Sequence, residues 1–147
     1  MDNLLREVDS IKNQGVFFSF LDGDKSAPKC ATRDIAATAS KLLLDSSWSG
    51  QGHRTVLGPE DLSFNDMAHI MSEVLERPVR YQQTSLDSLK ARLLESGMSQ
   101  AFVEGYVEMM VAKNNGLDNA EPRTPENATP TTFRQWCEEV LKPAVLS

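Results

Sequence analysis

The sequence predicts an α/β fold with about six helices and three or four short strands. Helical and extended patterns alternate along the first part of the chain, which favours parallel strands joined by crossover helices. In the helical segments apolar residues recur every three or four positions, and short β-favouring runs lie between Gly and Pro breakers. The later segments carry helical patterns and loops, so we expect a mostly helical lid there.

Composition and charge exclude several classes of protein. The 147 residues are 40% hydrophobic and have a net charge of −6. This acidic balance argues against nucleic-acid binding, because a phosphate backbone requires clustered Lys and Arg. The sequence shows neither a long apolar span nor the pattern of a signal peptide. We therefore expect a cytoplasmic protein without a membrane span, in which Cys30 and Cys137 are free thiols.

The first segments predict a helix, a strand and a second helix. Leu and Val spacing indicates a helix over Asn3–Asn13, and Gly15 is placed to end it. The apolar run Val16–Leu21 is too short for a helix and predicts a strand. The second helix is expected to begin with Thr32 as its cap. Its expected apolar face consists of Ile35, Ala39, Leu42 and Leu43.

The central segment predicts a strand, a capped helix and another strand. Thr55–Leu57 is β-favouring, and Ser63 and Asp66 have the spacing of a capping box. Pro78 ends the helix, and Val79–Tyr81 resumes an extended pattern. The helix has an apolar stripe formed by Met67, Ile70, Met71, Val74 and Leu75.

The last third predicts three helices and a loop. One helix covers Ser85–Ser96, and Ser99 caps the next. Thr132 opens the last helix, and Pro143 is expected to stop it. We divide the chain into an α/β region over residues 1–116, a Pro-rich loop over 117–131 and a C-terminal helix over 132–147.

Motifs for catalysis, cofactor binding or metal binding are absent from the sequence. Gly50–Gly52 is the one G-x-G, and it lacks the third glycine and the following helix of a dinucleotide-binding loop. Neither Tyr81 nor Tyr106 has a Lys four residues later to lower its pKa. His53 and His69 lack partners at metal-ligand spacing. We therefore expect no catalytic, cofactor-binding or metal-binding residue in this chain.

Four stretches, in the same order, resemble the NmrA-like proteins, which are atypical short-chain dehydrogenase/reductase relatives. They are MDNLLREVDSIKNQGVFF, CATRDIAATASKLLLD, LGPEDLSFNDMAHIMSEVLERPVRY and TPTTFRQWCEEVLKPA. The resemblance covers nearly the whole chain but only the second half of the family's fold. The glycine-rich first half, which binds NAD(P) in the family, has no counterpart here.

The resemblance implies the C-terminal, substrate-side part of a Rossmann-like fold. In the family this part closes over the nicotinamide end and shapes a pocket for a small apolar substrate. On this basis the candidate pocket residues are Asn3, Phe17, Phe18, Asp34, Phe102 and Tyr106. Structural alternatives stay open: core burial for the aromatic residues, and a first-turn helix charge or an ion pair with Arg33 for Asp34.

Two functional hypotheses follow. The first is the substrate-binding half of an NAD(P)-binding protein of the reductase or redox-sensor type, without activity or bound cofactor on its own. The second is a non-catalytic interaction or regulatory module that acts through protein contacts. Without the first half, Phe17, Phe18 and the helix over 35–43 would leave apolar surface and a strand edge open. We therefore expect either a homodimer or contact with the missing N-terminal half.

Overall fold

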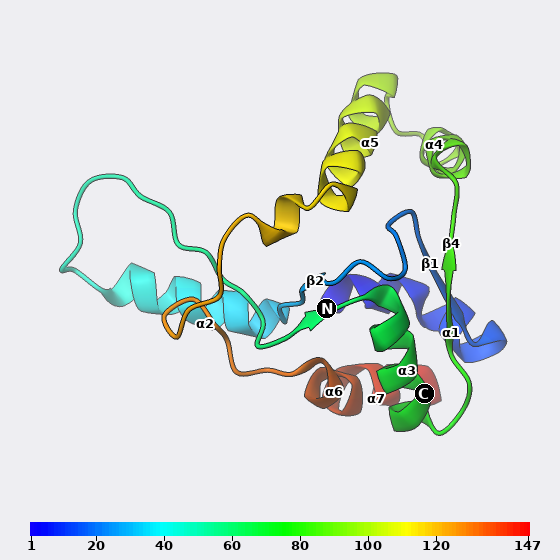
Figure 1. Ribbon diagram of the computed structural model, residues 1–147, viewed down its shortest axis with the longest axis horizontal. Helices are drawn as coiled ribbons and strands as arrows, with labels where there is room; N and C mark the ends of the chain where they lie inside the picture. Colours follow the sequence, from blue (N-terminus) through cyan, green and yellow to red (C-terminus); the bar gives the residue numbers. More distant parts are fainter.

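The computed structural model describes residues 1–147 as an α/β protein with the predicted numbers of helices and strands (Figure 1). The strands are β1 (Val16–Ser19), β2 (Ala27–Pro28), β3 (Asp61–Leu62) and β4 (Arg80–Gln83). The helices are α1 (Val8–Gln14), α2 (Thr32–Leu44), α3 (Phe64–Leu75), α4 (Leu86–Glu95), α5 (Gln100–Asn114), α6 (Phe133–Trp136) and α7 (Lys142–Leu146). A π-helical segment joins α6 to α7, so these two form one continuous helix. None of the helices combines the length and the apolar content needed to cross a membrane.

The predicted parallel pairing joins β1 to β4. Val16 lies opposite Arg80 and Ser19 opposite Gln83, with both strands running the same way. Gly15 precedes β1 in the left-handed conformation, with φ of 65°, and ends α1 as predicted. The first helical segment is tighter than expected at its start, because Asp2–Glu7 is a 3₁₀ helix.

The predicted capping box opens α3. The Ser63 hydroxyl accepts a hydrogen bond from the Asp66 N–H at 3.1 Å, and the Asp66 carboxylate accepts one from the Ser63 N–H at 2.9 Å. The helix ends at Glu76, whose φ of 55° is left-handed, two residues before Pro78. The cap therefore fixes the direction in which α3 leaves the β3 strand.

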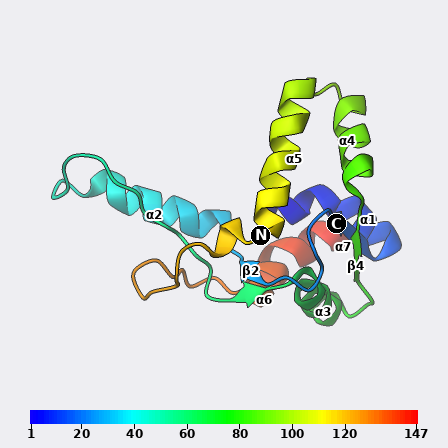
Figure 2. The ribbon, with the colours of Figure 1, turned by 45° about the horizontal axis from the view of Figure 1, so that its top comes forward.

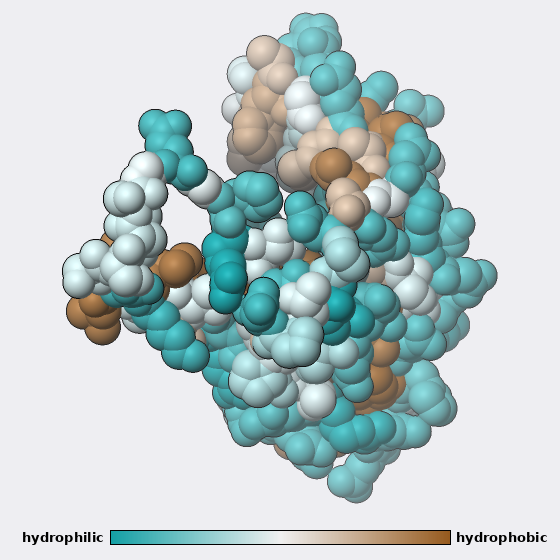
Figure 3. Space-filling view, turned by 60° about the vertical axis from the view of Figure 1, so that its left-hand side comes forward, coloured by the Kyte–Doolittle hydropathy of each residue, from teal (hydrophilic) through white to brown (hydrophobic).

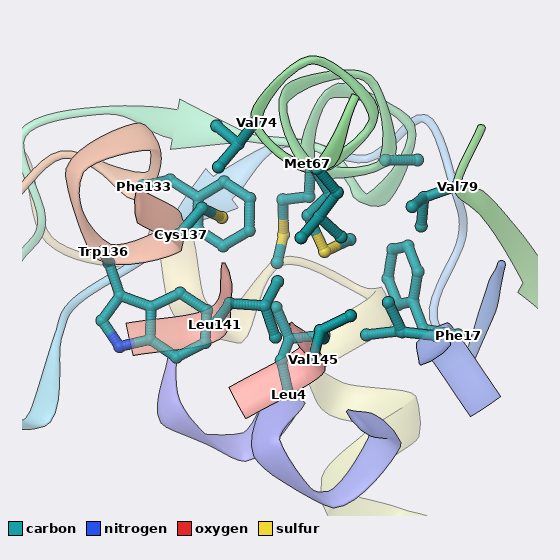
Figure 4. Close-up of a cluster of buried hydrophobic side chains, with 14 of the residues drawn as sticks. Leu4, Phe17, Met67, Val74, Val79, Phe133, Trp136, Cys137, Leu141 and Val145 are labelled. Atoms are coloured by element: carbon teal, nitrogen blue, oxygen red, sulfur yellow. The ribbon is translucent and has the colours of Figure 1, made fainter. Parts of the chain in front are cut away.

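The core lies between α3, the N-terminal helical segments, β1 and the C-terminal helix (Figure 4). Its largest fully buried side chains are Trp136, Phe17, Phe133, Ile11, Met71, Leu141, Val145 and Cys137. Phe133 and Trp136 stack with ring centroids 5.9 Å apart. The predicted stop at Pro143 is wrong, since the helix continues to Leu146. Proline is tolerated in the first turn of a helix, and the π-helical segment makes Pro143 part of such a turn.

Two further sequence predictions are wrong at the residue level. Thr55–Leu57 forms no strand, because only Leu57 pairs, in an isolated parallel bridge with Ala128. No neighbouring strand offers a longer ladder there. The N-cap of α2 is Ala31 rather than Thr32. The Thr32 N–H donates a hydrogen bond to the Asp2 carboxylate at 2.8 Å.

Helix α2 projects from the body of the protein (Figures 1 and 2). Its predicted apolar face is exposed: Ile35 is 48% exposed, Leu43 84% and the neighbouring Leu44 87%. Trp48, in the loop that follows, is 58% exposed. Figure 3 shows hydrophobic residues at the end of this projecting arm. The part of α2 beyond its first turn therefore packs on no other element.

Helices α4 and α5 form a hairpin that stands above β4 (Figures 1 and 2). The buried side of α5 carries Val103, Val107 and Met110. Phe102 and Met109 face outward, with 49% and 42% of their surface exposed. Phe102, a candidate pocket residue, therefore lies on the solvent side of α5, whereas Tyr106 is half-buried.

Candidate functional site

The candidate site is a small pocket beyond the carboxyl end of β1, one of the two parallel strands. Leu21 and Asp22 follow β1 directly, and the α4–α5 hairpin that follows β4 contributes the end of α5. Ligands of open α/β sheets bind at this end of the strands. The pocket has a volume of about 20 Å³ and is lined by Leu21, Asp22, Lys25, Ala27, Lys29, Phe64, Lys113, Asn114 and Asp118.

Hydrogen bonds hold the loop after β1 against the first turn of α3 and the end of α5. The Asn65 N–H donates to the Gly23 carbonyl at 3.0 Å, and its side-chain amide donates to the Asp24 carboxylate at 2.7 Å. The Asp22 N–H donates to the side-chain oxygen of Asn114 at 2.9 Å. The pocket thus lies between three segments that are fixed to one another.

Lys29 reaches the pocket from the segment just after β2. Its backbone carbonyl lies against Gly58, where an added Cβ would come within 1.7 Å of that oxygen. Only glycine allows this approach. The Lys29 Nζ lies 5.3 Å from the centroid of the Phe64 ring, within range of a cation–π interaction. Burial lowers the pKa of Lys29 below its usual value.

Two other lysines line the same pocket. The Lys25 ammonium donates to the Asn114 carbonyl at the end of α5. Lys113 pairs with Asp118, five residues later in the chain. Cations near the last carbonyls of a helix also interact favourably with its dipole. The pocket therefore has three ammonium groups around one small opening.

A larger hollow of about 190 Å³ lies beside the loop over 117–131. It is lined by Pro28, Leu57, Asp61, Asn119, Glu121, Pro122 and Arg123. Arg123 is engaged there, since it pairs with Asp61 and donates to the Gly58 carbonyl at 2.8 Å. These bonds join the loop to the β3 region. We therefore assign this hollow a structural role, and the pocket at the strand ends remains the candidate site.

None of the six candidate residues implied by the family resemblance lines this pocket. Their role in substrate binding stays a prediction. Phe17 is fully buried, with its ring centroid 6.1 Å from that of Phe64, so it supports the pocket from the core. Phe18, next along β1, is half-buried, and burial along the strand falls from Val16 and Phe17 to Phe18 and Ser19 without alternating. Asn3 is exposed in the 3₁₀ segment.

Asp34 lies in another part of the molecule. It is 8% exposed, and both of its carboxylate oxygens accept hydrogen bonds from Thr131. Arg33 pairs with Glu139 rather than with Asp34. Phe102 and Tyr106 stack on α5 with ring centroids 6.0 Å apart. The structure thus brings together only these two of the six residues.

Sequence reasoning missed the lysines of the pocket. Lys25, Lys29 and Lys113 come from two distant segments, and no local spacing relates them. The neighbouring Cys30 is a free thiol, as predicted, and burial raises its pKa.

The structure offers neither a metal centre nor a dinucleotide-binding loop. No group of three His, Cys, Asp or Glu side chains is close enough to hold a metal ion. The Gly50–Gly52 segment lies in the exposed loop after α2, where nothing contacts either glycine. His53 and His69 are largely exposed, with Glu121 and Glu73 as their respective neighbours.

Comparisons with curated proteins find relatives that include two named reductases. The chain is 31% identical over 109 residues to an NAD(P)H azoreductase of Xenophilus azovorans, which covers 74% of this chain and 37% of that protein. It is 27% identical to the (4-alkanoyl-5-oxo-2,5-dihydrofuran-3-yl)methyl phosphate reductase of Streptomyces griseus, over 95% of this chain and 49% of that protein. No family model matches the sequence.

Among solved structures, the fold matches a nucleoside-diphosphate-sugar epimerase of Staphylococcus aureus with a TM-score of 0.70 at 19% identity, over 94% of this chain and 48% of that one. The chain therefore has the fold of the C-terminal part of a Rossmann-like NAD(P)-binding protein. Its resemblance to the NmrA-like group of atypical short-chain dehydrogenase/reductase relatives, carried by the four matching stretches, agrees with these comparisons. The chain spans at most about half the length of the curated relatives it matches.

Proposed function

We propose that these 147 residues form the substrate-side half of an NAD(P)H-dependent reductase and contain no phosphate-binding glycine loop. The observation that carries the proposal is the pocket beyond the carboxyl end of β1, beside the end of α5. In parallel sheets this edge faces the ligand. The azoreductase and phosphate-ester reductase among the relatives support reductase chemistry.

The proposed role of the chain is to bind and orient a substrate. The pocket combines apolar atoms of Leu21, Ala27 and Phe64 with the polar ends of its lysines. Such a combination buries part of a small molecule and fixes its orientation. NAD(P)H, when bound, supplies a hydride, and the group that receives it would have to lie at the mouth of this pocket.

Cofactor binding would depend on a glycine-rich βαβ unit that the 147 residues do not contain. The pyrophosphate of a dinucleotide is held by backbone N–H groups at a helix N-terminus. Glycines there allow the backbone to approach the pyrophosphate closely. Here Gly50 and Gly52 precede an irregular segment rather than a helix. We therefore expect no specific NADPH binding by the chain alone. Calorimetric titration checks this, and a dissociation constant in the low micromolar range would contradict it.

A chimera tests the proposal directly. The NAD(P)-binding half of the Xenophilus azovorans azoreductase would be joined to residues 1–147 at the start of the aligned region. We expect the chimera to bind NADPH and to oxidise it in the presence of an azo dye or a quinone. The isolated azoreductase half and the 147-residue chain serve as controls. A folded chimera that binds NADPH but oxidises it no faster than the isolated half would overturn the proposal.

A second candidate function is an interaction module without catalysis. The projecting helix α2 favours it, because Leu43, Leu44 and Trp48 expose apolar surface that a protein partner could cover. The chimera separates the two candidates, since an interaction module would confer no NADPH oxidation. For either candidate we propose that a second copy of the chain covers α2, because two-fold pairing is the commonest closed arrangement.

A further inference from the structure

Lys29 carries an ammonium group without an acceptor in the protein. Its surroundings act on its pKa only through burial and through the charges of Asp118, Lys113 and Asp61. The Phe64 ring stabilises the charge of the ammonium from one side. It has no oxygen atom that could accept a hydrogen bond from the three N–H groups. A half-buried charge with unused donors is costly unless a ligand or water binds it.

The charges around Lys29 favour an anion as that ligand. The pocket is lined by three ammonium groups and two carboxylates, those of Asp22 and Asp118. Lys113 engages the Asp118 carboxylate, and the nearby Asp61 is engaged by Arg123. One positive charge is therefore left in excess at the opening, and of the three lysines only Lys29 lacks a hydrogen-bond or ion-pair partner in the protein.

We propose that this pocket binds an oxyanion, a carboxylate or phosphate group, with the Lys29 ammonium as its principal donor. A volume of about 20 Å³ admits one atom the size of a water oxygen, so one oxygen of the group enters and the rest of the ligand lies outside. Charge-assisted hydrogen bonds are the strongest that such a site can offer. Lys25 contributes a second ammonium to the same opening.

The oxyanion could belong to a substrate or to the cofactor. The assignment of the oxyanion to the substrate rests on the proposed function. The binding of an oxyanion to Lys29 does not depend on that function. An anionic substrate would place one oxygen of its charged end on Lys29, and its body would lie outside the opening. The site would then select for substrates that carry an acidic group.

Titration of the 147-residue chain at constant ionic strength tests the proposal. Acetate, inorganic phosphate and adenosine 2′,5′-bisphosphate are the three probes, and amide chemical shifts or calorimetry reports binding. We expect Lys29→Gln to weaken acetate or phosphate binding at least about tenfold, the loss expected for one charge-assisted contact. Lys41→Gln is the matched control, because it removes the same charge from the exposed face of α2.

The probes also identify the source of the oxyanion. Acetate or phosphate binding as tight as that of the nucleotide supports a substrate group. Much tighter nucleotide binding that still depends on Lys29 supports a cofactor phosphate. Failure of the azoreductase chimera would leave these results unchanged, because binding of the three probes requires no reduction.

A second readout follows Lys29 itself. Lysines labelled by reductive ¹³C-methylation are titrated with and without phosphate, and the Lys29 signal is assigned from the Lys29→Gln spectrum. We expect phosphate to raise the pKa of Lys29 and to leave that of Lys41 unchanged. If Lys29→Gln fails to fold, Lys25→Gln replaces it, with a smaller loss of binding expected. Absence of binding for all probes, or equal weakening by Lys29→Gln and Lys41→Gln, would overturn the proposal.

Discussion

Asp34 and Thr131, which are 97 residues apart in the chain, are joined by two hydrogen bonds. The Thr131 N–H donates to one carboxylate oxygen of Asp34 at 3.1 Å, and the Thr131 hydroxyl donates to the other at 2.9 Å. Arg33 donates to the same hydroxyl at 3.1 Å. These contacts attach the first turn of α2 to the segment that leads into the C-terminal helix.

Removal of the Asp34 carboxylate is expected to destabilise the protein. Asp34→Ala leaves a buried N–H and a buried hydroxyl without their acceptor, at a cost of about 2–3 kcal/mol. Asp34→Asn keeps one acceptor oxygen and should lose roughly half as much. Urea denaturation measures both variants. Equal stability of Asp34→Ala and the parent protein would show that this buried contact contributes nothing.

The cap of α3 is expected to contribute a smaller amount. Ser63→Ala removes the hydroxyl that accepts the Asp66 N–H and should cost about 1 kcal/mol, the usual effect of losing an N-cap. Ser99→Ala is a useful comparison, because Ser99 caps the more exposed α5 in the same way at 3.3 Å. The prediction fails if the denaturation midpoint of Ser63→Ala is unchanged.

Association of two copies is expected through α2. Leu43→Glu places a charge on a side chain that is 84% exposed in the single chain and should shift a dimer to monomer. Leu146→Glu makes the same change at an exposed site on α7 and should leave the dimer intact. Light scattering after size exclusion gives the mass of each variant. A monomeric parent protein at tens of micromolar would contradict the prediction.

The buried thiol of Cys137 predicts a loss of stability at high pH. Burial raises the pKa of Cys137 from 9.0 to about 12, so the folded state holds this proton when the unfolded state has lost it. The resulting stability is present below about pH 9 and declines as pH rises toward about 12. Denaturation at a series of pH values measures this decline.

Two measurements separate the contribution of Cys137 to this pH dependence from other groups. Cys137→Ala should reduce the slope of the free energy of unfolding against pH. Burial also raises the pKa of Tyr81 to about 12, and this should account for part of the slope that remains. In the native protein a thiol reagent should modify the half-buried Cys30 before Cys137. Equal rates for the two thiols would contradict the burial of Cys137.

Local signals predicted the parts of the fold that neighbours in sequence determine. The Ser63–Asp66 capping box, the left-handed Gly15 and the short strand after it were all predictable, because each depends on backbone chemistry within a few residues. The predicted strand over Thr55–Leu57 is absent because strand propensity has no effect without a neighbouring strand. The predicted helix end at Pro143 is wrong because a π-helical segment accommodates this proline.

The candidate site was not predictable in the same way. Lys29 and Lys113 come close only when the loop after β1 is fixed against the end of α5, and no periodicity encodes that contact. The aromatic pattern of α5 indicated a buried or pocket-lining stripe, but Phe102 faces outward. A helix shows which of its residues share a face, whereas the side of the molecule that this face meets depends on the whole fold.

Parallel pairing of β1 with β4 also determines the order in which the protein is expected to fold. The chain between the two strands contains α2 and α3, and it must close into a long loop before Val16 can pair with Arg80. Closing the loop costs entropy before any contact between the strands stabilises the chain, so such pairings form slowly. Helix α3 needs no closure, since its cap is made by close neighbours. We therefore expect α3 to be structured in the transition state and the edge that carries the pocket to be completed last.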